Sequence, residues 1–395
     1  MQKKILLITD RPVDKRFWDY WLFTKFEECF SAEWKIEIVA LAYLHDFTAP
    51  SNFVPHPKFV LRIFESEADF LKFLGNFNSR EVLLLLYTWA KVNFFNKIID
   101  LIEIKRFEYI YLMHGEGDNI IKPLSSSRSD LLSELLDGLI WALRILKRVF
   151  QRRGPAYWLN GTRARYRAQL PDAAPIGFRT KFPVIGLHTI DQLREAKTVL
   201  HVKGQKIAVW LDQNVPFVNQ FGISFDVDMV SYYQTLSGLF ESLREQGYQI
   251  YFSFHPESDS EKNSNVVLPS LPPYIIPYQG SSADVISFAD LIVTHNSTAC
   301  YMAVALNKPI LFVLFSHVDK QYWIDGTKNL GRALGMPVLM FTEGKSCKIE
   351  FEKIEVNPRL YKKFQKFFIN GQNKFSPSYK IMSAYIQKAG MKVFS

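Results

Sequence analysis

The segment Tyr248-Gln-Ile-Tyr-Phe-Ser-Phe254 is rich in β-branched and aromatic residues and is followed directly by His255-Pro256. After a polar loop, residues Ala289–Thr298 predict a second short strand with a polar end, Ala299–Leu306 predict a helix, and Lys308–Leu314 predict a third strand. Apolar strands that alternate with helices are typical of a buried parallel sheet. We therefore expect a Rossmann-like, nucleotide-binding half-domain around this stretch.

Polar residues follow these strands where ligands bind in such sheets, beyond the carboxyl ends. His255 ends the first strand, and Ser297 and Thr298 precede the helix after the second. We expect Ser297 or Thr298 to cap that helix, whose free N–H groups suit a phosphate. The loop Asp212-Gln213-Asn214 follows the strand expected at Ala208–Leu211 and is predicted to face the same way.

The composition is that of a globular protein with an anionic partner. A chain of 395 residues favours two domains, and 48% hydrophobic with 22% charged residues is ordinary for folded proteins. The net charge of +9 points to nucleic acid, a membrane surface or a phosphorylated substrate. Three dispersed cysteines predict neither a disulfide framework nor a metal cluster. Without a signal peptide or an apolar run long enough to span a bilayer, we expect a cytoplasmic protein, soluble or peripheral.

The first half of the chain alternates strands with helices, which favours a doubly wound α/β domain. The last of its strands leads into the glycine-bearing turn His114-Gly-Glu-Gly-Asp118. The expected strands are Lys4–Thr9, Lys35–Ala42, Phe59–Phe64, Val82–Tyr87 and Tyr109–Met113, and the expected helices are Lys15–Phe30, Glu67–Phe77 and Val92–Lys105.

A basic amphipathic segment follows at 131–167. No Asp or Glu occurs from Trp141 to Leu170, and the segment carries a group of cations near its middle. One interpretation is a helix lying on an anionic membrane or binding an anionic acceptor, and the other is a buried helix with a solvated basic end. The candidate contact residues are Arg144, Lys147, Arg148, Arg152 and Arg153.

A proline-bearing stretch, Leu170–Val184, predicts the domain boundary, and the alternation restarts at Lys206. A helix is expected at Met229–Gln246, loop and helix at Asp319–Leu334, and a short strand at Met336–Phe341. We expect one domain at 1–180, a second at 181–358, and C-terminal helices at 359–395 that could pack back on the first domain. The fold class is then α/β, with two Rossmann-like doubly wound domains facing each other across a cleft.

The turn His114–Asp118 lacks the third glycine of a dinucleotide fingerprint. It is suited instead to hold Glu116 or Asp118 at the mouth of a cleft, where a carboxylate could act as general base towards an acceptor hydroxyl. The alternative is an ordinary turn with solvated acids.

The other motifs also have plain structural alternatives. His255 before Pro256 could donate to a phosphate oxygen or be a loop histidine, and Asn296-Ser297-Thr298 could be a simple helix cap. As a glycosylation sequon this tripeptide needs a secretory signal, which is not found. Asp226-Val-Asp228 matches the DxD signature of metal-dependent transferases, but its place before a helix favours capping. The side chain of His295 could point to either face of its strand.

Several classes of protein have no support in the sequence. The zinc-hydrolase, P-loop and serine-hydrolase motifs do not occur. Neither does a zinc-finger, helix-turn-helix or RNP-like signature, so nucleic acid is not the expected partner.

Four polar motifs follow one another along the chain: His114–Asp118, Leu211–Asn214, His255-Pro256 and Asn296–Thr298. Together they resemble the motifs of the bacterial sialyltransferases and related CMP-nonulosonic acid transferases of GT-B fold, which include enzymes for Kdo. The resemblance implies that Glu116-Gly117 supplies the base, that His255-Pro256 contacts the CMP phosphate, and that Ser297-Thr298 binds it. Gly115 stands where the family has a first acid, so Asp118 is kept as a second candidate base.

This resemblance implies an inverting, metal-independent glycosyltransferase that needs no cofactor and uses a CMP-sugar as donor and a glycan, or a lipid-linked glycan, as acceptor. It also implies the GT-B arrangement, with an acceptor domain at 1–180 and a nucleotide-sugar-binding domain at 181–358. Gln213, Asn214 and Asn296 join the candidate donor-binding residues. His114-Gly115 also resembles the CDP-glycerol polymer transferases, in which His114 would be the base. A GT-B protein that binds a nucleotide or carbohydrate without catalysis is the third possibility.

Overall fold

A computed structural model of the chain describes two compact units. The described residues up to His188 form one unit together with 376–394, and those of 189–369 form the other. The structure describes residues 3–10, 13, 17–18, 25–26, 28–44, 53–87, 92–113, 156–160, 180–181, 183–184, 186–197, 204–217, 219–220, 223–224, 227–255, 271–318, 321–342, 349–351, 354–369 and 376–394.

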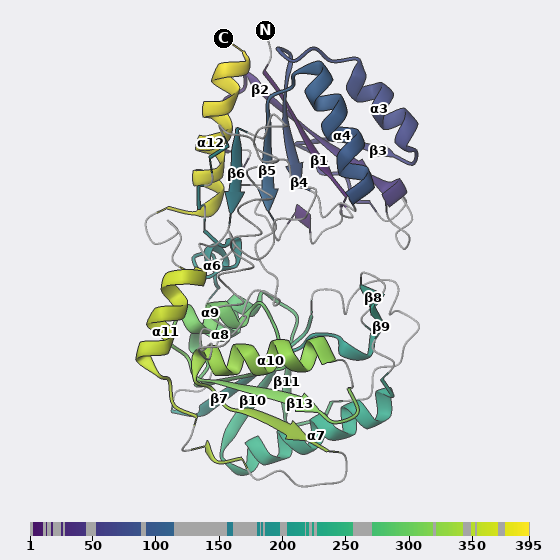
Figure 1. The fold of residues 1–395 in the computed structure, drawn as a ribbon. Helices are drawn as coiled ribbons and strands as arrows, with labels where there is room; N and C mark the ends of the chain where they lie inside the picture. The colour runs from purple at the N-terminus through teal and green to yellow at the C-terminus, as the bar shows by residue number, and fades with distance from the viewer. Residues whose placement is uncertain are drawn as a thin grey trace, which may run out of the picture. The chain divides into compact units, whose positions relative to one another are not determined.

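The N-terminal unit contains a six-stranded parallel sheet in the order β3-β2-β1-β4-β5-β6 (Figure 1). Five of its strands were expected from the sequence. The sixth, β6, lies within the segment that was interpreted as basic and amphipathic, and its Tyr157 and Leu159 are buried. The strands are β3 (Val60–Phe64), β2 (Trp34–Leu41), β1 (Lys3–Thr9), β4 (Val82–Tyr87), β5 (Tyr109–Met113) and β6 (Tyr157–Asn160).

Both faces of this sheet are covered, because its strands alternate apolar side chains between two cores. Leu6 and Ile8 face α3 (Glu67–Gly75) and α4 (Val92–Lys105). Ile5 and Leu7 face the opposite core, which includes side chains of α12 (Ser378–Val393). Figure 1 shows α12 on one side of the sheet and α3 and α4 on the other. The C-terminal helices expected at 359–395 include α12, which runs to Val393 and completes one core of this unit.

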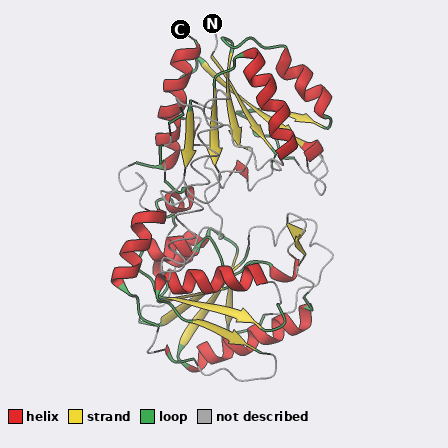
Figure 2. Ribbon diagram, viewed as in Figure 1, coloured by secondary structure: helices red, strands yellow, loops and turns green. Residues whose placement is uncertain are grey.

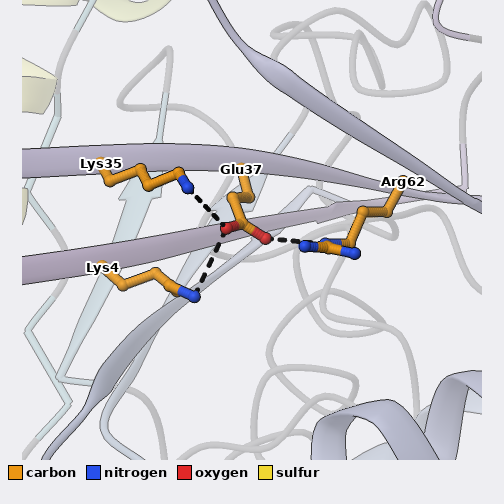
Figure 3. Close-up of polar contacts among 4 residues, drawn as sticks. All are labelled: Lys4, Lys35, Glu37 and Arg62. Carbon is orange, nitrogen blue, oxygen red and sulfur yellow. Dashed lines mark hydrogen bonds and ion pairs between the residues drawn. The ribbon is translucent and has the colours of Figure 1, made fainter.

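A buried carboxylate interrupts the apolar pattern of β2. Glu37 is 1% exposed and lies within reach of three cations, one on β1, one on β2 itself and one on β3 (Figure 3). Arg62 Nε donates to Glu37 Oε2 at 2.8 Å, and the Nζ atoms of Lys4 and Lys35 lie 3.4 and 3.6 Å from Oε1. Burial would raise the pKa of Glu37, but the hydrogen bond from Arg62 and the charge of Lys4 outweigh it and hold the pKa below its ordinary value.

The C-terminal unit contains a second six-stranded parallel sheet, in the order β11-β10-β7-β12-β13-β14. The sequence predicted only a polar loop between Pro256 and Ala289, and this prediction is wrong. The segment contains a strand, β11, and a helix, α8. The strands are β11 (Ile275–Tyr278), β10 (Tyr248–Ser253), β7 (Lys206–Leu211), β12 (Leu291–Thr294), β13 (Ile310–Phe315) and β14 (Val338–Phe341). The helices are α7 (Met229–Glu245), α8 (Ser282–Phe288), α9 (Cys300–Ala305), α10 (Gln321–Leu334) and α11 (Pro358–Phe364), which continues as the π-helix Gln365–Ile369.

Strand β11 has a sequence pattern that does not predict a strand. It is short and carries Pro277, which is tolerated because β11 lies at the edge of the sheet. Its pattern Ile-Ile-Pro-Tyr is only partly buried, unlike the uniform apolar runs of β12 and β13.

Numbered within each unit, the strands of both sheets follow the order 3-2-1-4-5-6, which is the order of the dinucleotide-binding doubly wound fold. The expected α/β class with two Rossmann-like domains is therefore confirmed (Figure 2). Among the helices that the structure describes, none has the length and apolarity to cross a bilayer.

Candidate functional site

The candidate site lies at the carboxyl edge of the C-terminal sheet, where the strand order reverses. Strands β7 and β12 are adjacent at this reversal, and β10 pairs with the other side of β7. In open parallel sheets the crevice beyond such a reversal is where ligands bind. The three polar loops singled out in the sequence follow these three neighbouring strands, so the fold brings Gln213, His255 and Asn296 to one edge.

Asp212 organises the loop after β7. Its Oδ1 accepts the N–H of Asn214 at 3.1 Å, and its Oδ2 lies 3.5 Å from the N–H of His255 after β10. Asn214 has a φ of 54°, a left-handed conformation that asparagine tolerates better than most residues. Burial raises the pKa of Asp212, although the N–H groups of Asn214, His255 and Gln213 oppose this shift. The sequence analysis did not assign Asp212 this role in joining two loops.

Gln213 joins the loops across the reversal itself. Its side-chain Oε1 accepts the N–H of Asn296 at 2.6 Å. Asn296 is 4% exposed, and its own side-chain Oδ1 is buried without a hydrogen-bond donor among the residues that the structure describes. A buried acceptor of this kind is costly unless a ligand or water supplies the donor. The hydrogen bond from Gln213 therefore fixes the backbone of Asn296, while the side-chain oxygen of Asn296 can still accept a hydrogen bond from a ligand.

His255 lies directly after β10 and is partly exposed. Its backbone is held through Asp212, while the N–H of the preceding Phe254 donates to the carbonyl of Tyr278 at 3.1 Å. These contacts fix the position of the histidine backbone beside β7. Pro256, its partner in the sequence motif, lies outside the described residues.

His295 is part of the core and not of the ligand-facing edge. Its Nδ1 donates to the carbonyl of Val313 at 2.8 Å, because a carbonyl can only accept, and its Nε2 then accepts the hydroxyl of Tyr232 at 3.0 Å. The ring also packs edge-on against Trp210 and Phe315. Burial lowers the pKa of His295 to about 4, so the ring is neutral at physiological pH.

The expected cap by Ser297 or Thr298 is wrong. Helix α9 begins at Cys300, and its N-cap residue is Ala299, which makes no side-chain capping bond. The Ser297 hydroxyl instead accepts the N–H of Ala299 at 3.2 Å, while the carbonyls of Ser297 and Thr298 accept the N–H groups of Cys300 and Tyr301. The tight turn at 297–299 thus uses the serine oxygen locally, as hydroxyl residues often do.

The DxD-like motif behaves as a cap, as expected. Asp228 is the N-cap of α7, and its Oδ2 accepts the N–H of Ser231 at 2.7 Å. These bonds to Ser231 hold the pKa of Asp228 below its ordinary value. Asp226 lies outside the described residues.

The neighbouring edge strand adds polar groups that the sequence analysis missed. Ser253 at the end of β10 and Ser282 at the start of α8 have hydroxyls 3.1 Å apart. Tyr278 at the end of β11 donates to Asp284 at 2.6 Å. The serine that caps α8 was the available sequence signal, because Ser281 stands just before this partly apolar helix.

Two groups of candidate residues lie outside the described residues: the candidate bases Glu116, Asp118 and His114, and the cations Arg144, Lys147, Arg148, Arg152 and Arg153.

Comparisons with known proteins show the fold. No family model matches the sequence, and a search of curated proteins finds no match. Among solved structures, a histidine-to-alanine variant of the wall teichoic acid polymerase TagF is similar, with a TM-score of 0.51 at 12% identity, covering 100% of this chain and 91% of that chain. A second structure of TagF gives a TM-score of 0.50 at 12% identity with the same coverage.

Proposed function

We propose that this chain is a glycosyltransferase that holds a cytidine-nucleotide donor at the carboxyl edge of its C-terminal sheet. The observation that supports it is the convergence of the loops after β7, β10 and β12 at the strand-order reversal. There Gln213 and Asn296 are hydrogen-bonded, and the buried Asn296 Oδ1 has no hydrogen-bond donor among the described residues, so it can accept one from a ligand. A ribose hydroxyl or a base amino group supplies such a donor.

The proposed reaction is inverting transfer of a nonulosonic acid from CMP to a saccharide acceptor, in the assembly of a bacterial surface polysaccharide or lipooligosaccharide. The acceptor oxygen attacks the anomeric carbon, and the bond from this carbon to the phosphate oxygen of CMP breaks. The bonding electron pair leaves with CMP, and the acceptor proton passes to Glu116, with Asp118 as the second candidate. His255 and the Ser297–Thr298 turn donate to the departing phosphate, so this step requires no metal.

A second candidate is transfer of glycerol phosphate from CDP-glycerol. The fold likeness to the polymerase TagF favours it. In this reaction the acceptor oxygen attacks the β-phosphorus, the bond from that phosphorus to the bridging oxygen breaks, and CMP again leaves. His114 would then take the acceptor proton.

The experiment is to supply each donor and follow CMP release in the presence of a panel of saccharide and glycerol-phosphate acceptors. We expect acceptor-stimulated CMP release from a CMP-nonulosonic acid. If CMP is released from CDP-glycerol and not from the CMP-nonulosonic acid, the reaction is glycerol phosphate transfer and not nonulosonic acid transfer. Binding of CMP with no turnover of either donor would identify a non-catalytic protein, and preference for UDP or GDP over cytidine nucleotides in a thermal-shift panel would contradict both reactions.

The segment 131–167 is proposed to hold the enzyme at the inner face of the cytoplasmic membrane or to bind an anionic acceptor. Its cations near Arg148, with no intervening acid, support this role. Charge reversal at Arg148, Arg152 and Arg153 is expected to release the protein from anionic liposomes. Retention of the triple variant on these liposomes would contradict the membrane role.

A further inference from the structure

Helix α11 and the turn that continues it present a single basic face. Arg359, Lys362 and Lys363 are spaced at i, i+3 and i+4, which places them on one side of α11, and Lys366 follows in the π-helix Gln365–Ile369. All four are exposed, whereas Tyr361, Phe364 and Phe368 on the other side are buried. We refer to these four cations as the α11 basic face.

The α11 basic face is not neutralised from within the protein. None of its four side chains forms an ion pair or hydrogen bond with a residue that the structure describes. The sequence from 356 to 395 contains no Asp or Glu. The helix dipole accounts for Lys362 and Lys363 in the last turn, but it disfavours a cation in the first turn, where Arg359 lies. An external anion would offset this unfavourable placement.

The face is held on a rigid support. The Tyr361 hydroxyl donates to the carbonyl of Lys308 at 2.9 Å, and the rings of Phe364 and Phe368 stack with centroids 4.5 Å apart. Gln365, the residue before Lys366, donates to the carbonyl of Val304 at 2.7 Å and to Asn307 Oδ1 at 3.0 Å.

These bonds bring the turn after α9 alongside α11. Leu306 in this turn is 39% exposed, so the segment that is hydrogen-bonded to α11 carries an aliphatic side chain at the surface. Cations beside an exposed aliphatic residue are the combination that suits the headgroup and acyl boundary of a bilayer.

We propose that the α11 basic face binds the surface of an anionic lipid bilayer. This contact is separate from segment 131–167 and does not depend on the identity of the donor. A bilayer fits better than nucleic acid, because proteins that bind single strands present aromatic side chains to the bases. The large hydrophobic side chains exposed in the described part of this protein are all aliphatic or methionine.

The test is co-sedimentation with vesicles of phosphatidylglycerol and phosphatidylcholine in equal parts, and with vesicles of phosphatidylcholine alone. The full chain is compared with a variant carrying Arg359→Gln, Lys362→Gln, Lys363→Gln and Lys366→Gln. Each cation near an anionic surface contributes roughly fivefold in affinity, so the loss of four cations is expected to weaken binding to the anionic vesicles by about six-hundredfold. Neither protein is expected to bind phosphatidylcholine alone.

A matched control removes the same charge from scattered positions that are also exposed. It carries Lys72→Gln, Arg80→Gln, Arg194→Gln and Lys328→Gln, and it is expected to stay on the anionic vesicles with a small loss of affinity. Equal release of both variants would overturn the proposal, because net charge and not this face would then decide binding. The proposal would also be overturned if the α11 variant bound anionic vesicles as tightly as the unmodified protein does. Binding of the full chain to RNA but not to vesicles would overturn it as well. Unchanged circular dichroism and melting temperature verify that the variants are folded.

The exposed aliphatic residue gives a second readout. Leu306→Ser is expected to lower vesicle affinity severalfold while leaving the net charge unchanged. An unaltered affinity for this variant would remove Leu306 from the contact.

Discussion

The N–H of Asn296, after β12, donates to the side-chain oxygen of Gln213, after β7, at 2.6 Å. This bond spans the one place in the C-terminal sheet where the chain reverses its direction of strand addition. Two loops separated by 83 residues in sequence are thereby fixed against each other. The spacing of the loops after β7 and β12 thus depends in part on one glutamine.

Replacing Gln213 by methionine keeps the length of the side chain but removes the acceptor. The N–H of Asn296 would lose its partner, which is expected to cost about 1–2 kcal/mol of unfolding free energy. We also expect CMP to bind about tenfold more weakly, as measured by calorimetry, because the two loops are no longer held in register. Gln234→Met, at an exposed position on α7, is the control and should alter neither quantity. An unchanged CMP affinity in Gln213→Met would show that the hydrogen bond between Gln213 and Asn296 does not contribute to CMP binding.

His255→Ala is expected to lower transfer by about a hundredfold, since a donor to the departing phosphate is lost. The melting temperature should fall little, because the contact with Asp212 uses the backbone N–H of His255 and not its ring. His255→Gln retains an N–H donor and should recover part of the activity. Equal losses of activity and stability in His255→Ala would identify a structural histidine.

His295 makes stability depend on pH in a defined direction. Its folded pKa of about 4 lies below the ordinary value of 6.5, so between these values the unfolded chain binds more protons. Stability therefore falls as pH decreases through this window, by about 2 kcal/mol from this group between pH 7.5 and pH 5. Urea denaturation at pH 7.5 and at pH 5 measures this change in the free energy of unfolding.

The control for this pH effect is a variant without the titrating ring. His295→Gln should be less stable at pH 7.5 and should lose correspondingly less stability on acidification. Tyr232→Phe, which removes the hydroxyl bonded to Nε2, should destabilise by about 1–2 kcal/mol at pH 7.5. An equal pH dependence in wild type and His295→Gln would contradict the buried neutral histidine.

Glu37→Ala is expected to destabilise the N-terminal unit, because it leaves three cations without their common carboxylate (Figure 3). The cations are partly exposed, so we expect a cost of about 1–3 kcal/mol, below that of a fully buried pair. The folded pKa of Glu37 is lowered, so its contribution is present above the unfolded pKa and is lost as pH falls through the folded value. Glu33→Ala, which removes the surface pair with Lys3, should produce no measurable change in thermal melting.

The parts that sequence could predict are those with a strong local pattern. Continuous apolar runs such as Ile310–Phe315 are buried on both faces, and α7 ends within one residue of its expected limit. Strand β11 and helix α8 were missed because an edge strand with a proline and a seven-residue helix have weak periodicity. Strand β6 was missed because it has only four residues and lies between the arginine-rich stretches 152–153 and 163–167.

At the candidate site, the sequence placed His255, Gln213 and Asn296 at strand ends but left their neighbours undefined. Only the strand order made β10, β7 and β12 adjacent. The inward direction of His295 was decided by Val313 and Tyr232, which are distant in the sequence. The cap expected of Ser297 failed because a tight turn competes for the same oxygen.

The sequence by itself determined the alternation of strands and helices, the two-domain α/β class and the positions of the polar strand ends, because these follow from local periodicity and from short turn signals. The tertiary structure alone decided which strand ends meet, which polar atoms are used up and which remain available to a ligand. The physical reason is that hydrogen-bond satisfaction and desolvation depend on neighbours brought together by the fold, as with Gln213 and Asn296.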